Sequence, residues 1–320
     1  MKLSVVIPCY NEEGNVRPLL EACVATFKDL SSFELIFVND GSRDGTWAAL
    51  KELYAQRPCA MKLVNFSRNF GKEAAMYAGM QKASGEYVSL LDADLQQSPQ
   101  IVLDMVEFLD LNPDYDCVAA YQETRHEGKF TTWCKKTFYR MMDRICDISL
   151  HEGASDFRTF RRGVAESILS VKECYRFSKG IFSWVGFNTH FIPYEAQERH
   201  SGATNWSFWK LLKYALDGII SYTTFPLKVS TFTGGLMALL SLIYMVVVVV
   251  QKLAFGIDIP GYPTIIVLIL LIGGLQMITL GIIGEYIARI YIQGKHRPLY
   301  IAKEYLSTQE EGEQDAGHSL

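Results

Sequence analysis

Residues 87–99 read YVSLLDADLQQSP, an apolar run that ends in two aspartates one residue apart. The apolar part is short, and polar residues and a proline follow it at once. Such a run, bounded by turn-forming residues, is typical of a buried strand. The stretch therefore predicts a strand whose end carries two carboxylates, Asp92 and Asp94.

The same rhythm extends over the first part of the chain. Similar strand-like runs are LSVVIP, FELIFV, MKLVNF and DCVAAY. The segments with helical spacing are Val16–Leu30, Thr46–Gln56, Lys72–Lys82 and Ile101–Leu111. Strands that alternate with helices in this way predict an α/β domain, with a mostly parallel sheet covered by helices on both faces.

In sheets of this class, ligands bind beyond the carboxyl ends of the strands. Three of the predicted strands end in polar stretches: PCYNEEGN after the first, NDGSRDGT after the second and DADLQQSP after the fourth. Turns and helix caps use the same residue types, so NDGSRDGT alone is equally consistent with a loop in which Asp44 or Thr46 caps a helix. The three stretches together predict a cleft at those strand tips.

Asp92 and Asp94 would project to the same side of an extended chain, and their charges repel unless a cation lies between them. Magnesium is commonly held by one or two carboxylates together with substrate phosphates. The sequence contains neither G-x-x-x-x-G-K-[ST] nor G-x-G-x-x-G, so no such loop holds the phosphates. The pair of aspartates therefore predicts a Mg²⁺ or Mn²⁺ site that bridges the protein and a diphosphate.

Two uncharged runs of 22 residues, Val229–Val250 and Pro263–Gly284, follow the α/β part. Each would be about 33 Å long as a helix, enough to span a hydrocarbon core of about 30 Å. A buried helical hairpin of a soluble protein is the weaker alternative, because soluble helices rarely lack a polar face. Glycine pairs in both runs could pack the spans within one chain or between the chains of a homo-oligomer.

The distribution of charge predicts the orientation of the spans, whereas the net charge of −4 says little about partners. Basic residues flank the two runs on their outer sides, and the connecting AFGIDIPGY has none. By the positive-inside rule, both flanks are cytoplasmic. The apolar run in MKLSVVIP is too short for a signal peptide, so we expect the catalytic part and both termini in the cytoplasm of a bacterium, at its inner membrane.

Other kinds of site find no support in the sequence. The seven cysteines form no C-x-x-C pair and have no histidine at zinc spacing, so they read as reduced thiols. There is no H-E-x-x-H and no G-x-S-x-G. We expect no nucleic-acid partner.

Five motifs carry a resemblance to a known family. They are VVIPCYNEEGNV, FVNDGSRDGT, NFGKEAAMYAGMQKASGEYVSLLDADLQQSP, DFRTFRR and GEYIARIYIQGKHRPLY. Together they resemble the family-2 glycosyltransferases, and more narrowly the polyprenyl-phosphate branch that includes dolichol-phosphate mannose synthases and undecaprenyl-phosphate (bactoprenol) glucosyltransferases. The resemblance runs from about residue 3 to residue 302 and implies a GT-A fold, a nucleotide-sugar donor and an inverting transfer.

The resemblance also implies roles for individual residues. Those expected to line the nucleotide-sugar pocket are Pro8, Tyr10, Asn11, Glu12, Asp40 and Asp92. Those expected to hold the metal and the diphosphate are Asp92, Asp94 and Gln96. Two positions depart from the family pattern, since Asn39 stands where dolichol-type members often have an acid and Asn205 stands where a lysine is common.

Asp156, in GASDFRTFRRG, matches a family aspartate proposed as the general base for the acceptor. A phosphate monoester is already mostly ionised near neutral pH, so this residue could instead orient the acceptor, or simply pair with Arg158 or Arg162. The resemblance implies acceptor-phosphate contacts from Arg158, Arg161 and Arg199.

A polyprenyl phosphate would have to be met at the membrane surface. In the stretch 129–148, cationic residues fall four apart on one helical stripe, and in 206–225 tryptophans and tyrosines mix with lysines as in interfacial helices. An ordinary amphipathic helix packed on the domain is the alternative for each. The predicted domains are 1–205 (catalytic), 206–227 (interfacial helix), 228–292 (two transmembrane helices) and 293–320 (cytoplasmic tail, disordered after 306).

The combined interpretation is a metal-dependent, inverting hexosyltransferase. It would move glucose from UDP-glucose onto undecaprenyl phosphate and so supply a lipid-linked sugar for cell-envelope glycan or O-antigen modification, with a separate flippase as partner. The alternatives are another sugar, a diacylglycerol or polysaccharide acceptor, and a membrane protein that binds sugar nucleotides without turnover.

Overall fold

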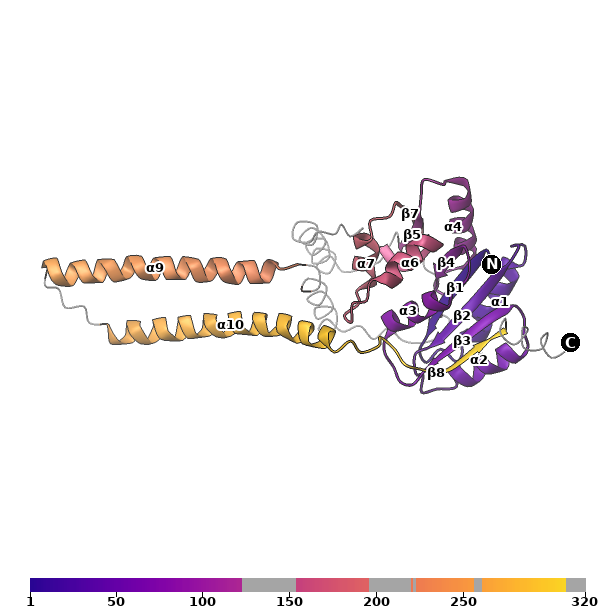
Figure 1. Cartoon of the computed structure of the whole chain (residues 1–320), viewed down its shortest axis with the longest axis horizontal. Helices are drawn as coiled ribbons and strands as arrows, with labels where there is room; N and C mark the ends of the chain where they lie inside the picture. The colour runs from indigo at the N-terminus through magenta and orange to yellow at the C-terminus, as the bar shows by residue number, and fades with distance from the viewer. Residues whose placement is uncertain (123–153, 196–219, 221–222, 256–260, 309–320) are drawn as a thin grey trace. The chain divides into compact units, whose positions relative to one another are not determined.

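The computed structural model describes residues 1–122, 154–195, 220, 223–255 and 261–308. The chain forms two compact units (Figure 1). The first comprises Met1–Ala215 together with Arg297–Leu320, and the second comprises Leu216–His296. The predicted interfacial helix and the basic stretch 129–148 lie almost wholly outside the described residues.

The first unit is built on an eight-stranded sheet. Its strands, in spatial order, are β7 (Thr189–Tyr194), β5 (Cys117–Gln122), β6 (Ala154–Arg161), β4 (Tyr87–Leu90), β1 (Leu3–Cys9), β2 (Phe33–Asn39), β3 (Ala60–Phe66) and β8 (Ala302–Ser307). The four central strands are parallel, whereas β6 and β8 run antiparallel to their neighbours. The predicted α/β class with a mostly parallel sheet is confirmed.

Helices cover both faces of this sheet (Figure 1). On one face, α1 (Val16–Phe27) contacts both α2 (Thr46–Ala55) and α4 (Pro99–Leu111), and on the other α3 (Lys72–Lys82) contacts α6 (Arg162–Ser170). The central strands β1, β2, β3 and β4 are buried on both faces, which explains why they read as continuous apolar runs. The parallel connections place the ends of β1, β2, β3 and β4 at one edge of the sheet.

Helix α3 lies unusually close to the sheet. A side chain added at Gly79 would place its Cβ 2.2 Å from a methyl carbon of Val6, so only glycine fits there. The helix is buried from Ala74 to Met80. Its first residue, Lys72, is therefore fixed at the edge formed by the carboxyl ends of the central strands. Its last residue, Lys82, is fixed near the edge formed by their amino ends.

A buried ion pair closes the amino edge beneath the end of α3. The Nζ atom of Lys62 lies 2.8 Å from an Oε atom of Glu34, and it donates a hydrogen bond to the carbonyl oxygen of Lys82 at 2.8 Å. Glu34 also accepts hydrogen bonds from the hydroxyls of Ser4 at 2.6 Å and Ser84 at 2.7 Å. The polar groups of this network are thus paired with one another inside the protein.

Strand β8 was missed by the sequence analysis, which treated residues 293–320 as a tail. It pairs with β3 in antiparallel register at the edge of the sheet. The ring of Tyr300, just before it, stacks on Phe66 with centroids 4.8 Å apart, and its hydroxyl donates to Gln81 at 2.8 Å. The segment that follows the second apolar run is therefore part of the first unit.

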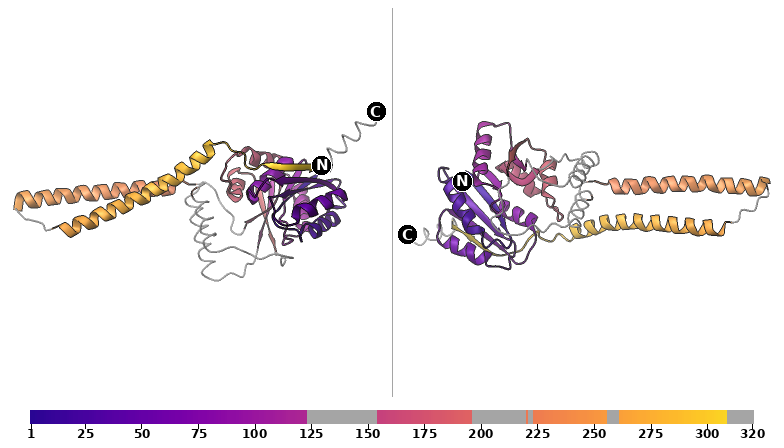
Figure 2. Two further views of the ribbon diagram at one scale, coloured as in Figure 1. Left: turned by 90° about the horizontal axis from the view of Figure 1, so that it is seen from below. Right: turned by 180° about the vertical axis from the view of Figure 1, so that it is seen from behind.

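The second unit is a hairpin of two long helices, α9 (Phe225–Phe255) and α10 (Tyr262–Gly294). They contact each other, and Figures 1 and 2 show them running along one another. Their spans Phe225–Gln251 and Val267–Gly294 have mean hydropathies of 2.4 and 2.3, and their residues are not buried by protein. Both predicted apolar runs thus form helices that are long and apolar enough to cross a membrane.

Candidate active site

The loops after β1 and β2 are joined by hydrogen bonds. The amide of Asn11 donates to the Ser42 hydroxyl at 3.0 Å, and the amide of Arg43 donates to Oδ1 of Asn11 at 2.9 Å. The amide of Glu12 donates to the hydroxyl of Thr46 at 2.9 Å. The structure therefore brings these two strand tips together, as the sequence predicted.

The predicted nucleotide-binding residues at the end of β1 lie along the seam, the line of contact between the loops after β1 and β2. Pro8 is in β1, and Tyr10 beyond it is 42% exposed. The carboxylate of Glu12 accepts a hydrogen bond from the side-chain amide of Asn15 at 2.6 Å. Tyr10 thus offers an open aromatic face, whereas Asn11 and Glu12 also shape the loop.

Asp40, at the second tip, is only 3% exposed and holds the loop that follows β3. Its two carboxylate oxygens accept hydrogen bonds from the amides of Phe70 at 2.6 Å and Gly71 at 2.9 Å. Burial raises the pKa of Asp40, and these two donors offset part of the rise. Gly41 has φ +62° and lies so close to the backbone of Arg68 that a Cβ would sit 2.4 Å from its carbonyl carbon. A third strand tip, residues 67–71, therefore joins the predicted cleft.

Asp92 and Asp94 lie in a turn rather than in the extended chain that the sequence analysis assumed. Strand β4 ends at Leu90, and Leu95 has φ +61°. Oδ1 of Asp94 accepts a hydrogen bond from the amide of Gln96 at 3.2 Å. The amide of Asp92 donates to the side-chain oxygen of Gln97 at 3.1 Å. The side-chain amide of Gln97 in turn donates to Oδ2 of Asp92 at 3.4 Å. Hydrogen bonds within the turn, and not the alternation of a strand, thus fix the two carboxylates.

Lys72, the first residue of α3, bridges two carboxylates. Its Nζ atom lies 2.7 Å from Oδ1 of Asp92 and 3.2 Å from Oδ2 of Asp156. The side chains are 43%, 33% and 21% exposed, in the order Lys72, Asp92, Asp156. Burial disfavours the charged ammonium, but the two carboxylates outweigh it and hold the pKa of Lys72 above its ordinary value.

Asp156 comes from β6, which lies beside β4. Burial alone would raise the pKa of Asp156, but the positive charges of Lys72, Lys179 and Arg158 outweigh it, so that the pKa falls below its ordinary value. Asp156 is therefore a carboxylate at neutral pH. The structure thus brings it to Asp92, on the tip of β4.

Glu73, the next residue of α3, ties the helix to α7 (Ser178–Trp184). Its carboxylate accepts hydrogen bonds from the amide of Ser178 at 3.1 and 3.2 Å and from the Ser178 hydroxyl. Burial and the nearby charge of Asp156 raise the pKa of Glu73 to about 7, although Ser178 and Arg176 act in the opposite direction. The first turn of α3 is therefore held from two sides.

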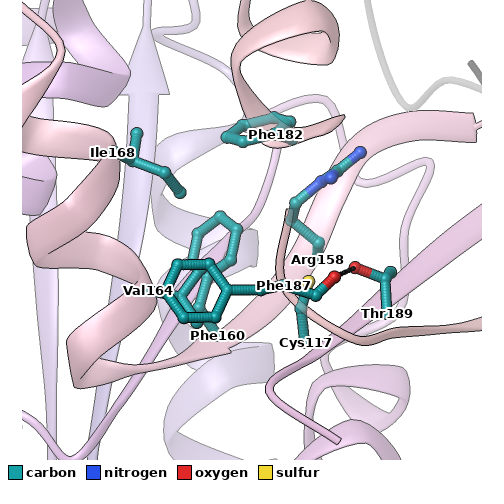
Figure 3. Close-up of a pocket in the computed structure, with 8 residues that line it drawn as sticks. All are labelled: Cys117, Arg158, Phe160, Val164, Ile168, Phe182, Phe187 and Thr189. Atoms are coloured by element: carbon teal, nitrogen blue, oxygen red, sulfur yellow. Dashed lines mark hydrogen bonds between the residues drawn. The ribbon is translucent and has the colours of Figure 1, made fainter. Parts of the chain in front are cut away.

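Arg158 is a residue of β6, and its side chain lines a small pocket and is only 5% exposed. Its guanidinium carbon lies 3.9 Å from the ring centroid of Phe182, toward which Figure 3 shows the side chain pointing. One nitrogen donates to the carbonyl oxygen of Ser155 at 2.8 Å. The pocket is lined by Cys117, Arg158, Phe160, Val164, Ile168, Phe182, Phe187 and Thr189, which leave no space for a water molecule between them. Arg158 therefore influences Asp156 by its charge from a packed position.

The other two predicted acceptor contacts are not brought to this edge. Arg161 pairs with Tyr87 at the opposite end of β4, and its guanidinium donates to the carbonyl oxygens of Tyr115 at 2.9 Å and Leu109 at 2.7 Å. It fastens the end of α4 to the sheet. Arg199, like Asn205, lies outside the described residues.

The predicted metal ligands have oxygen donor atoms. Asp92, Asp94 and Gln96 offer carboxylate and amide oxygens, which suit Mg²⁺ and Mn²⁺. Within the described part of the chain, no three His, Cys, Asp or Glu side chains gather closely enough to hold a metal ion by themselves. The set fits an ion that takes its remaining ligands from substrate phosphates and water.

Lys72 and Glu73 are the residues that the sequence analysis missed. Lys72 has its partners 20 and 84 positions away along the chain, in Asp92 and Asp156. The only local signal was its place directly after Gly71, whose φ of +96° marks the end of the third strand tip. A search of every strand tip, including the third, would have found it.

Comparison with known proteins identifies the family. Residues 4–169 match the model of glycosyl transferase family 2, and residues 225–290 match that of the GtrB C-terminal hairpin. An uncharacterized glycosyltransferase of Synechocystis sp. is 41% identical over 309 residues, covering 95% of both chains. The bactoprenol glucosyl transferase of Shigella phage SfV is 38% identical over 305 residues, covering 95% of this chain and 98% of that protein.

Among solved structures, glucosyl-3-phosphoglycerate synthase from Mycobacterium tuberculosis has a TM-score of 0.46 and 17% identity, covering 67% of this chain and 76% of that one. Nothing about function rests on a likeness of that size. The family matches and the curated relatives, together with the α/β sheet and the apolar hairpin, lead to one conclusion. The chain belongs to glycosyl transferase family 2, in the group of bactoprenol glucosyl transferases, and is a glycosyltransferase.

Proposed function

We propose that this glycosyltransferase moves glucose from UDP-glucose to undecaprenyl phosphate at the cytoplasmic face of a bacterial inner membrane. The names of its relatives support this donor and acceptor, since the proteins of Shigella phages SfV and SfII, both 38% identical, are bactoprenol glucosyl transferases. The hairpin of α9 and α10 supports a lipid acceptor, because the catalytic unit and a bilayer anchor are parts of one chain.

The reaction would be a single displacement. An oxygen of the lipid phosphate attacks the anomeric carbon of the sugar and forms a bond to it as the bond from that carbon to the β-phosphate oxygen of the donor breaks. UDP leaves with the electron pair, and an α-linked donor gives a β-linked product. The phosphate monoester is already mostly ionised near neutral pH, so little is required of a base.

The site residues divide between the two substrates in this proposal. Pro8, Tyr10 and Asn11 would line the nucleotide pocket at the seam of the first two tips, and Asp40 would shape it by holding residues 70 and 71. Asp156 would orient the acceptor. Because its pKa is held below the ordinary value, Asp156 would act chiefly as a fixed negative charge among cations, and not as a group that collects a proton.

Asp92, Asp94 and Gln96 would hold Mg²⁺ or Mn²⁺. The bound ion would neutralise the negative charge of the departing diphosphate. The chain itself supplies the two carboxylates, which accept hydrogen bonds from the amide of Gln96 (to Asp94) and the side-chain amide of Gln97 (to Asp92).

The observation that carries the proposal is the junction of the β4 tip with the start of β6. There Asp92, on the predicted donor side, and Asp156, on the predicted acceptor side, are bridged by a single ammonium group with contacts of 2.7 and 3.2 Å. A junction of this kind supports the proposal, because a donor diphosphate at Asp92 and an acceptor phosphate at Asp156 would then be neighbours. The cations near Asp156 favour an anionic acceptor over a neutral diacylglycerol.

The test is release of UDP or GDP by the full chain purified in detergent. The donors are UDP-glucose, UDP-galactose, UDP-GlcNAc and GDP-mannose, each with and without undecaprenyl phosphate, and with Mg²⁺, Mn²⁺ or EDTA. We expect turnover of UDP-glucose only when lipid and metal are both present. Turnover with diacylglycerol in place of the lipid phosphate would overturn the acceptor, and donor binding without turnover over all lipids would indicate a binding protein.

A further inference from the structure

Lys72 is a cation that the proposed reaction does not use, yet it stands between the two site carboxylates. Its Nζ atom contacts Asp92 at 2.7 Å and Asp156 at 3.2 Å. Two carboxylates so close to one point repel each other unless positive charge lies between them. In the absence of donor, the chain therefore supplies the neutralising charge from its own helix.

The backbone at Lys72 is held firmly from both sides. On one side Asp40 binds the amides of Phe70 and Gly71, at 2.6 and 2.9 Å. On the other side Glu73 binds the amide and hydroxyl of Ser178. The movable part of Lys72 is its four-carbon side chain, whose ammonium carries three rotatable donors. The ammonium can thus change partners without any movement of α3.

The contact is also of a kind that exchanges easily. The Lys72 side chain is 43% exposed and that of Asp92 is 33% exposed, and ion pairs open to solvent are weak. Asp92 is one of the predicted metal ligands, and a divalent ion with its diphosphate brings more charge to a carboxylate than one ammonium does. Asp156 has no such competitor, so Lys72 would keep that partner.

We propose that Lys72 is a positioning residue: it occupies the cation position between Asp92 and Asp156 in the donor-free enzyme and yields Asp92 to the metal–diphosphate complex when the donor binds. This inference rests on the proposed function. After the exchange, Lys72 remains paired with Asp156 and holds that carboxylate in place beside the acceptor.

The experiment measures Mn²⁺ binding to the full chain in detergent, without nucleotide, from the electron paramagnetic resonance signal of the free ion. Lys72→Met removes the charge while keeping most of the side-chain volume, and Lys72→Arg keeps the charge. The matched control is Lys82→Met, which removes a lysine charge from the other end of α3, where Nζ lies 4.3 Å from the ring centroid of Tyr305. We expect Mn²⁺ to bind Lys72→Met about 10-fold more tightly than the wild type, because the competing charge is gone.

Lys72→Arg and Lys82→Met should bind Mn²⁺ as the wild type does. If the wild type shows no binding without nucleotide, a gain of binding by Lys72→Met supports the inference equally. Unchanged or weaker binding by Lys72→Met, or no binding by either protein, would overturn it, as would a Lys72→Arg variant that behaves like Lys72→Met. Turnover plays no part in this readout. If Mn²⁺ binding changes as expected while no donor turns over, the proposed function fails and the role of Lys72 stands.

Discussion

Two lysine–carboxylate pairs flank the same helix, and their surroundings differ. At the end of α3, the side chains of Lys62 and Glu34 are 9% and 1% exposed, and Ser4 and Ser84 also donate to Glu34. At the start of α3, Lys72 shares two carboxylates whose side chains are partly open to solvent. Burial would raise the pKa of Glu34, but the donors from Lys62, Ser4 and Ser84 outweigh it and lower that pKa.

Ion pairs of one kind thus stand in opposite surroundings at the two ends of α3. The buried pair is surrounded by donors and is almost wholly shielded from solvent. Breaking it would leave a charge without compensation in the core. The exposed pair costs little to open. The proposed exchange of Lys72 for a metal–diphosphate complex at Asp92 needs a contact of this kind. Exposure, and not residue type, separates the buried pair from the pair at the proposed site.

The largest expected effect is on turnover at the exposed end of the helix. Asp94→Asn and Asp156→Asn should each lower the rate of UDP release by about 10²–10³-fold, as removal of a single charge-stabilising group does in other enzymes. The matched control is Asp104→Asn on the exposed surface of α4, which should keep the wild-type rate. A loss smaller than about 5-fold in Asp156→Asn would remove this residue from the site.

The next effect is on stability at the buried end. Lys62→Met should destabilise the full chain by about 3–5 kcal/mol, because it leaves Glu34 buried and unpaired. Lys72→Met should change stability by no more than about 1 kcal/mol. Thermal unfolding in detergent, followed by tryptophan fluorescence, compares the two variants. Equal shifts in the midpoint would contradict the distinction between the pairs.

The third prediction is that Glu73 makes the stability of the protein depend on pH. Its carboxyl group faces Asp156, Arg176 and Ser178. Its pKa rises from 4.5 to about 7 on folding, so the folded state holds the proton more tightly. The stabilising contribution is complete below about pH 4.5 and is lost as the pH rises through about 7. Between pH 5 and 8, Glu73→Gln should gain about 2–3 kcal/mol relative to the wild type. A constant difference in unfolding midpoint across this range would show that Glu73 is ionised throughout.

The last prediction concerns stability at Tyr300, where the chain that follows α10 contacts α3. Tyr300→Phe removes the hydrogen bond to Gln81 but keeps the stacking on Phe66. Because this hydrogen bond is exposed, we expect a loss of about 0.5 kcal/mol and an unchanged rate of UDP release. Tyr300→Ala, which also removes the stacking, should lose more. A fall in turnover with Tyr300→Phe would indicate that this contact also affects the site.

Local patterns predicted most of the fold. The helix predicted at Lys72–Lys82 has those bounds in the structure, and the helix expected from Ile101 starts two residues earlier, where Ser98 caps it by accepting the amide of Gln100 at 3.3 Å. The period of apolar residues is a local property, so one sequence suffices to read it. Strand β8 was missed because its pairing with β3 depends on residues more than 200 positions away.

The site could be predicted only in part, for the same reason. The acids at Asp92 and Asp94 stand out because they end an apolar run, and both keep their place at a strand tip. Lys72 carries no such signal, since a lysine in the first turn of a helix is ordinary until its distant partners are known. Arg161 lies close to Asp156 in the sequence but five positions along a strand, which at about 3.3 Å per residue carries it to the other end of β4.

The pairing of β8 with β3 also sets the order in which this protein can be completed. The sheet receives its last strand from residues that follow both apolar helices, so the hairpin is an insertion within the sheet domain. During synthesis, β3 therefore has an open edge until α9 and α10 have been made. An open strand edge is a template for unwanted pairing with other chains. A shortened chain that ended before α9 would keep the edge of β3 open permanently. A soluble form of the enzyme should therefore join the part of the chain that precedes α9 directly to residues 297–308, which supply β8.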